Sequence, residues 1–233
     1  TSIGEYAFYN CAKLTSVTIG NGVTTIGEYA FGYAGMTSVT IGNGVTTIGD
    51  YAFHHCPALT SVTIPDSVTT LGYSAFSYCA KLTSVTIGNG VTNMGLYAFG
   101  YTALTSVTIG NGVTTIGNYA FYSCTNLTSV TIPDSVTSIG HSAFHGCPAL
   151  TSVTIGNGVT TIGYSAFGYT ALTSVTIPDS VTSIGSYAFY NCANLTTVTI
   201  GNGVTTIGSY AFYECANLTT VTIGNSVTTI GDS

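Results

Sequence analysis

Seven cysteines are the residues of this sequence best suited to chemistry, either as zinc ligands or as disulfides. Each lies three residues after a phenylalanine, and successive cysteines are alternately 45 and 23 residues apart: Cys11, Cys56, Cys79, Cys124, Cys147, Cys192 and Cys215. No CxxC pair is present, which disfavours a compact zinc site. Two alternatives remain, a buried column of apolar thiols and disulfides at Cys56–Cys79, Cys124–Cys147 and Cys192–Cys215. Because Ala34, Thr102 and Thr170 occupy the same place in other copies, we expect free thiols.

The four histidines offer a weaker chemical signal. His141 and His145 are spaced so that both imidazoles would share one side of a helix, as metal ligands do. The segment is barely one turn long and has no acidic ligand nearby, so we expect these two residues, and His54 and His55, to be ordinary surface groups. The GNG triplets lack the lysine of a phosphate-binding loop. No catalytic, cofactor-binding or metal-ligating residue is therefore predicted, and no cofactor.

Hydroxyl groups form a regular array. Two outward positions of every "LTSVTI" copy carry them: Ser16, Thr18, Ser38, Thr40, Ser61, Thr63, Ser84, Thr86, Ser106, Thr108, Ser129, Thr131, Ser152, Thr154, Ser174, Thr176, Thr197, Thr199, Thr220 and Thr222. The array contains no aromatic or arginine anchor of the kind that dominates protein interfaces. It suits a repetitive ligand, such as a glycan or ice, better than a single protein.

All 17 tyrosines lie between the "IG" of a repeat and the position of its cysteine. A candidate aromatic stripe stands just before Ala-Phe: Tyr29, Tyr51, Tyr97, Tyr119, Tyr187 and Tyr210. These rings either pack partly against the outer side with wet hydroxyls or contact another chain or a glycan. Asn126, Asn194 and Asn217 begin NLT triplets, which accept N-glycans in a secreted eukaryotic protein.

A repeat of 22 or 23 residues must position all these groups. It begins at Leu14 and recurs ten times, with three-repeat blocks of 68 residues at 14–81, 82–149 and 150–217. Self-similarity at this period indicates a solenoid, in which each copy packs on the next. We therefore expect one solenoid over 1–233, an excerpt of a longer array because the chain opens and stops within a repeat.

Each repeat has a readable local structure. "LTSVTI" alternates apolar and polar residues like a strand, GNG or PDS is a turn in which glycine supplies positive φ, and "VTTIG" is a second short extended piece. The "EYAFYNCAK" segment is too short for a stable α-helix and predicts 3₁₀ or short helical turns. Stacked rungs would give a parallel sheet with ~4.8 Å spacing. They would also give one buried phenylalanine ladder: Phe31, Phe53, Phe76, Phe99, Phe121, Phe144, Phe167, Phe189 and Phe212.

Charge is scarce. Only 4% of the residues are charged, the net charge is −6, and the two basic residues are Lys13 and Lys81. Nucleic acids and anionic membrane surfaces need clustered basic groups, so neither is an expected partner. No run of about 18 apolar residues is present, so no transmembrane segment is predicted.

The pattern L-x-x-V-x-I-[GP]-[ND]-[GS]-V-x-x-I-G-x-x-A-F-x-x-C resembles the 23-residue repeat of the BspA-like leucine-rich-repeat family. The resemblance implies a curved, mainly β solenoid of about ten rungs, with its parallel sheet on the concave side and the short turns on the convex side. It also implies an extracellular or cell-surface location and adhesion to host proteins or other cells. The family has no catalytic residues to carry over, and its curvature argues against ice.

These observations predict a non-enzymatic structural or adhesive solenoid. Uncapped end rungs would expose unpaired strand edges, which favours head-to-tail stacking of copies into a fibre or stalk. The expected partners are other copies of the chain, or surface proteins or glycans of a host or neighbouring cell. The alternative is a module that binds a repetitive ligand, glycan or ice, through the hydroxyl array.

Overall fold

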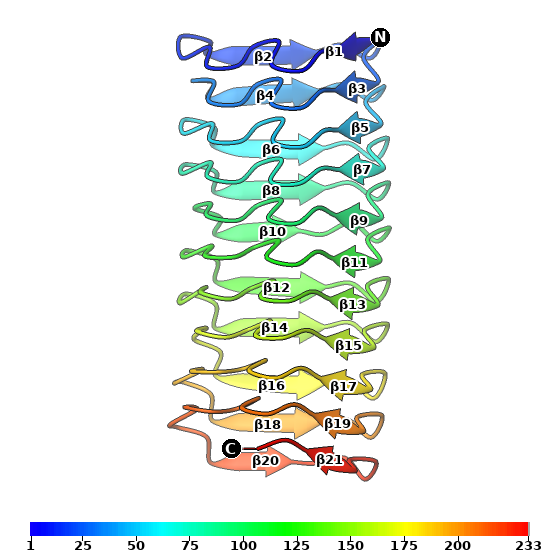
Figure 1. Ribbon diagram of the computed structural model, residues 1–233, viewed down its shortest axis with the longest axis vertical. Coiled ribbons are helices and arrows are strands. Elements are labelled where there is room, and N and C mark those ends of the chain that lie inside the picture. The colour runs from blue at the N-terminus through cyan, green and yellow to red at the C-terminus, as the bar shows by residue number, and fades with distance from the viewer. Residues whose placement is uncertain (233) are drawn as a thin grey trace.

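The computed structural model describes residues 1–232, which form a column of stacked β-turns of chain without a helix. Each rung carries one longer strand and one strand of two residues, and the rungs follow one another along the column (Figure 1). The predicted parallel β-solenoid of about ten rungs is thereby confirmed.

The two-residue strands form the one sheet that runs the length of the column. All its strand pairs are parallel and join rungs in sequence order. Its strands are β1 (Ser2–Ile3), β3 (Thr25–Ile26), β5 (Thr47–Ile48), β7 (Thr70–Leu71), β9 (Asn93–Met94), β11 (Thr115–Ile116), β13 (Ser138–Ile139), β15 (Thr161–Ile162), β17 (Ser183–Ile184), β19 (Thr206–Ile207) and β21 (Thr229–Ile230). The second extended piece of the repeat therefore supplies the continuous ladder.

The longer strands come from the "SVTI" motif, and their valines and isoleucines face inward. They are β2 (Ser16–Ile19), β4 (Ser38–Ile41), β6 (Ser61–Ile64), β8 (Ser84–Ile87), β10 (Ser106–Thr108), β12 (Ser129–Ile132), β14 (Ser152–Ile155), β16 (Ser174–Ile177), β18 (Thr197–Ile200) and β20 (Thr220–Thr222). Their pairing divides into sheets β2 to β10, β12–β14 and β16 to β20. Within the first sheet, β4 and β6 share only the pair Ser38 and Ser61.

Each weakened junction lies just before a rung whose turn reads PDS in place of GNG. In the GNG rungs the third turn residue approaches the previous rung closely: a Cβ on Gly44 would lie 1.9 Å from the carbonyl oxygen of Asn21. The serine of a PDS turn has that Cβ, so its rung must stand further off. Proline also lacks the N–H with which Gly88 bonds the Ile64 carbonyl (2.9 Å). Both effects separate the PDS rung from the rung before it.

The segment around each phenylalanine is a run of tight turns, so the expected 3₁₀ or short helical turns are wrong. Alternate N–H groups bond inside the rung, as Ala30 does to Gly27, and to the next rung, as Phe31 does to Ala52. This alternation requires left-handed residues two before and two after each phenylalanine, with φ between 49° and 60° at the non-glycine positions. The GNG glycines do not have positive φ, contrary to expectation; their role is the close approach described above.

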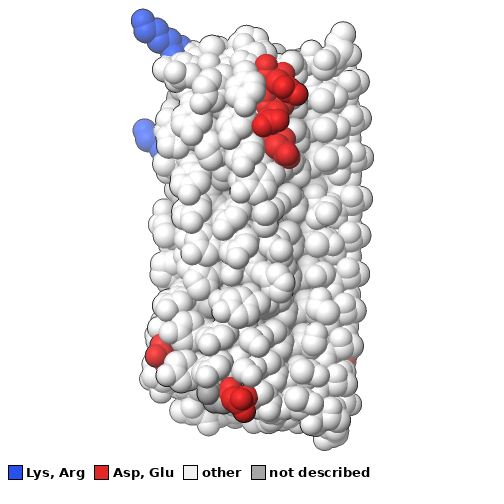
Figure 2. Space-filling model, in the orientation of Figure 1, with Lys and Arg blue, Asp and Glu red and all other residues white. Residues whose placement is uncertain are grey.

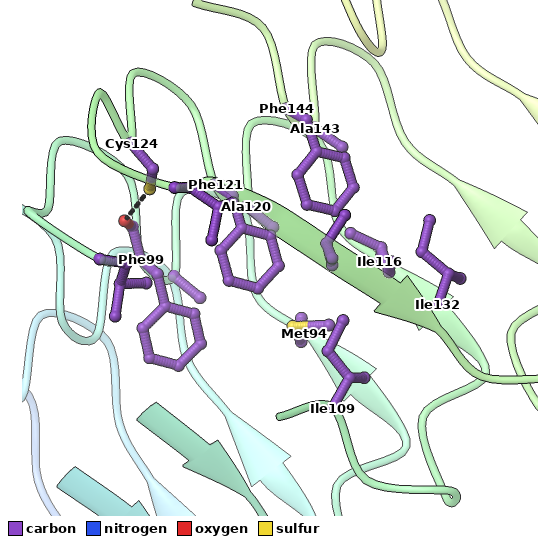
Figure 3. Packing of buried hydrophobic residues seen from close by; sticks show 14 of the residues in the cluster. Met94, Phe99, Ile109, Ile116, Ala120, Phe121, Cys124, Ile132, Ala143 and Phe144 are labelled. Atoms are coloured by element: carbon purple, nitrogen blue, oxygen red, sulfur yellow. Dashed lines mark hydrogen bonds between the residues drawn. The ribbon is translucent and has the colours of Figure 1, made fainter. Parts of the chain in front are cut away.

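The phenylalanines form the predicted buried ladder. Neighbouring rings from Phe8 to Phe212 are 4.9–5.5 Å apart and nearly parallel. Figure 3 shows Phe99, Phe121 and Phe144 in succession. The rings from Phe31 to Phe189 are at most 1% exposed, whereas Phe212 is half-buried because no following ring covers it.

The cysteines are free thiols beside this ladder, as predicted. Six of them donate a hydrogen bond from Sγ to the phenylalanine carbonyl of the preceding rung at 3.2–3.3 Å, as Cys124 does to Phe99 (Figure 3). In the short repeats Thr102 and Thr170 bond a phenylalanine carbonyl of their own rung. The thiol is thus a small buried donor, which explains why threonine can replace it.

Phe121→Ala should lower the free energy of unfolding by about 3–5 kcal/mol, because the ring is buried between Phe99 and Phe144. Phe212→Ala is the matched control and should cost less, about 1–2 kcal/mol, since only Phe189 stacks on it. Denaturant unfolding monitored by circular dichroism measures both. A Phe121→Ala loss below about 1 kcal/mol would contradict the inward ladder.

Changing the Pro133-Asp134-Ser135 turn to Gly-Asn-Gly should close the gap between β10 and β12, because it restores both the N–H and the close approach. Amide hydrogen exchange at Val130 and Thr131 should slow at least about tenfold, the equivalent of one added hydrogen bond. Val153 in β14 serves as the internal control. Unchanged exchange at Val130 and Thr131 would mean that the turn does not cause the gap.

Thiol labelling at pH 8 without reductant should modify about one cysteine of the native chain, Cys11, which alone among the seven is not buried. Burial raises the pKa of Cys124 to about 11, so its reactive thiolate is scarce at that pH. After denaturation all seven should react. Recovery of about half or fewer would instead indicate disulfides between neighbouring rungs.

Candidate functional site

The predicted hydroxyl array lies on the outward face of the longer strands. The strand register places Ser16 beside Ser38 and Thr18 beside Thr40, and the same alignment recurs in the other paired strands. Every residue of the array is exposed except Thr197, which is half-buried. The face therefore carries two columns of accessible hydroxyls.

Two other threonine columns serve structure. Thr37 Oγ1 donates to the Thr15 carbonyl and Thr46 Oγ1 to the Thr24 carbonyl, both at 3.1 Å, and the same bonds recur along the column. Sequence reasoning missed this role. The available signal was that these two positions are threonine in every copy, whereas the outward array mixes serine and threonine.

Three hollows interrupt the hydroxyl face, one at each weakened strand junction. Their volumes are about 680 Å³ at β4 and β6, 810 Å³ at β10 and β12, and 780 Å³ at β14 and β16. Strand hydroxyls and turn Asn or Asp side chains line each one. A face hollowed in this way is not flat, which disfavours ice and favours a flexible, hydroxyl-bearing ligand.

The aspartates of the PDS turns help hold the rungs together. Asp66, Asp134 and Asp179 each accept the backbone N–H of the following rung's turn asparagine at 2.6–2.7 Å. Asn21 and Asn89 do the same with their amide oxygens in GNG turns. These acidic groups therefore have a structural role at the edge of each hollow.

The predicted tyrosine stripe is half-buried. Tyr29 and Tyr51 stack at 4.5 Å, Tyr97 and Tyr119 at 4.6 Å, and Tyr187 and Tyr210 at 4.8 Å. Greater exposure occurs four positions later in the repeat, two residues after the phenylalanine, at Tyr33, Tyr78, Tyr101 and Tyr169. The surface most open to a partner on this side thus belongs to tyrosines outside the predicted stripe.

The histidines are not brought together as metal ligands. His145 Nδ1 lies 2.8 Å from Ser165 Oγ, whereas His141 Nδ1 accepts the N–H of Tyr164. His54 contacts Ser77 in the same way as His145 contacts Ser165. Burial lowers the pKa of both His54 and His145, so these imidazoles are neutral at pH 7. Within 1–232 no group of three or more His, Cys, Asp or Glu could hold a metal ion.

Charged groups are few on the face shown in Figure 2. Acidic side chains gather in a short column near the N-terminal end, and the middle of the face is uncharged. Glu5, Glu28 and Asp50 occupy one equivalent position in the first three rungs. Most of this face can therefore offer only neutral hydrogen bonds and aromatic contacts.

Residues 1–128 and 114–233 match the family described as BspA type leucine rich repeat region. None of the curated proteins matches the chain. The described residues include no helix long and apolar enough to cross a membrane.

Solved structures of bacterial leucine-rich-repeat proteins are similar to this chain. One from Bacteroides ovatus is 31% identical, with a TM-score of 0.82, over 100% of this chain and 66% of that one. A cell surface protein from Faecalibacterium prausnitzii is 32% identical, with a TM-score of 0.60, over 94% and 62%. A protein from Eubacterium ventriosum is 28% identical, with a TM-score of 0.64, over 99% and 78%. The chain thus spans less than two thirds of the first two proteins. Together with the family match over its full length, the stacked 22- and 23-residue rungs establish that this chain belongs to the BspA-type leucine-rich-repeat family.

Proposed function

We propose that this chain is a non-enzymatic structural and adhesive solenoid of the cell surface or extracellular space, in which further rungs continue the column end to end as a fibre or stalk. The observation that carries the proposal is the sameness of the contact between rungs, in backbone bonds and in side-chain stacking alike. The similarity to a Faecalibacterium cell surface protein supports the location.

Any rung can serve as a packing partner for any other. Within the described residues β1 pairs only with β3, and β21 only with β19, so each keeps one open edge. Core-type side chains lie exposed in the last rung: Ile223 is 48% exposed, whereas its equivalents Ile177 and Ile200 are 1% and 3% exposed under a following rung. A further rung, from the same polypeptide or from a second copy, would cover this apolar surface and complete the ladder.

Adhesion would use the outward faces, which remain free when rungs stack. The hydroxyl columns, their hollows and the exposed tyrosines all point away from the stacking axis. A longer column would present more copies of the same groups, which strengthens attachment to a repetitive surface through multivalency. Structural extension and adhesion are thus compatible in one molecule.

Residues 1–233 should self-associate in a concentration-dependent way, and Ile223→Lys should prevent it. Stacking would bury the introduced ammonium without a partner, which costs several kcal/mol and should weaken association at least about hundredfold. Thr222→Lys is the matched control, because its side chain is on the outward face of the same strand and should leave association intact. Light scattering across a concentration series measures all three proteins.

A chain that stays monomeric at the highest concentration would rule out stacking between copies. Equal weakening by Ile223→Lys and Thr222→Lys would show that association uses a lateral face, contrary to the end-to-end arrangement.

A further inference from the structure

One position of the repeat distinguishes a single rung from all the others. The residue two after the phenylalanine is left-handed in every rung and is Asn10, Tyr33, His55, Tyr78, Tyr101, Ser123, Gly146, Tyr169, Asn191 or Glu214. Only Gly146 has no side chain there. The absence matters because the next rung carries a tyrosine at the same position.

The preceding 68-residue block shows what normally fills this place. Tyr78 is the equivalent of Gly146, and Tyr101 is the equivalent of Tyr169. The Tyr78 and Tyr101 rings stack at 4.4 Å with an angle of 12° between them. In the later block Gly146 leaves that face of Tyr169 uncovered, and a cleft of about 550 Å³ opens beside it.

The cleft has an aromatic and apolar wall and a polar rim. His145, Pro148 and Tyr169 supply the wall, while the amides of Asn191 and Asn194 supply the rim. Each amide offers both a donor and an acceptor. No Lys, Arg, Asp or Glu lines the cleft, and His145 is neutral at pH 7 because burial lowers its pKa. A ligand must therefore be uncharged, with one apolar face and a hydrogen-bonding edge.

The aromatic wall is held in place before any ligand arrives. The Tyr169 ring makes edge contacts with His145 at 5.1 Å and with Tyr190 at 5.0 Å. His145 in turn stacks on Tyr122 at 5.3 Å and lies 2.8 Å from Ser165 Oγ. Since these rings need not be ordered on binding, little entropy would be lost there.

We propose that the cleft beside Gly146 binds a neutral pyranose ring of a glycan, with the C–H face of the sugar on Tyr169 and its hydroxyls on Asn191 and Asn194. A pyranose combines an apolar ring face with a polar edge, as the cleft requires. The volume lies within the roughly 300–1,000 Å³ of small-ligand sites. A protein partner would bury about 800 Å² on each side, far more than this cleft offers.

The inference goes beyond the proposed structural role and does not depend on it. The cleft is on the turn side of the column, away from the strand edges at which rungs would stack. A protein that stays monomeric could still bind sugar here, and one that assembles could fail to do so. The two experiments therefore fail separately.

Saturation-transfer NMR with four methyl glycosides tests the proposal, using the glucoside, galactoside, mannoside and N-acetylglucosaminide on residues 1–233. At least one should show transfer to its ring C–H protons. Gly146→Tyr should lower its affinity about tenfold or more by filling the cleft as Tyr78 does in the earlier block. The fold should tolerate this change, because Tyr78 has φ 59° and Gly146 has φ 70°. Tyr169→Ala should have the same effect by removing the wall.

Tyr101→Ala is the matched control, since it removes the equivalent ring of the earlier block, and the affinity should stay within about twofold. Absence of transfer to all four glycosides would overturn the proposal. A signal that survives both Gly146→Tyr and Tyr169→Ala would also overturn it, by assigning sugar binding to another surface such as the hydroxyl columns. Acetylated tetraproline amide probes a peptide ligand; transfer to this peptide alone, lost in Gly146→Tyr, would assign the cleft to a protein partner.

Discussion

The backbone contact between one rung and the next governs the rest of this structure. Along 27–34, alternate N–H groups bond inside the rung and to the rung that follows: Tyr29 reaches the Asp50 carbonyl at 3.0 Å and Tyr33 reaches the His54 carbonyl at 2.8 Å. These bonds leave no freedom for one rung to slide against another. Identical side chains must therefore lie directly above one another, as the parallel rings of Phe31 and Phe53 do.

A fixed register means that function can enter only by substitution at a fixed place. The PDS triplets keep the rung in line but hold it away from its predecessor, which opens hollows among the strand hydroxyls. Gly146 keeps the backbone angle that Tyr78 has and removes the ring, which opens a cleft. In both cases the change adds a surface feature while the ladders continue on either side. Variation on an otherwise uniform column is thus the informative part of this sequence.

Periodicity and alternation were sufficient to predict the solenoid, the inward Phe121 and its equivalents, and the outward Ser16 and Thr18. Those inferences need only the side-chain direction in a strand and the stacking of copies. The turn segment could not be predicted in the same way, because residues such as Tyr29 and Glu214 rarely adopt a left-handed backbone by themselves. The next rung imposes that conformation. The candidate tyrosine stripe was misjudged for the same reason, since stacking between rungs buries rings that look exposed in one repeat.

The left-handed positions also explain why the repeat cannot stand alone. Nineteen non-glycine residues occupy this region, at about 1–2 kcal/mol each for an L-residue. Within a rung the turn bonds are few, and the compensating bonds and ring contacts come from neighbours. A rung therefore folds favourably only against another rung, and its conformation is stored in the contact between them. The outward side chains take no part in that contact, so selection can alter the binding surfaces of such a column without altering the interaction that builds it.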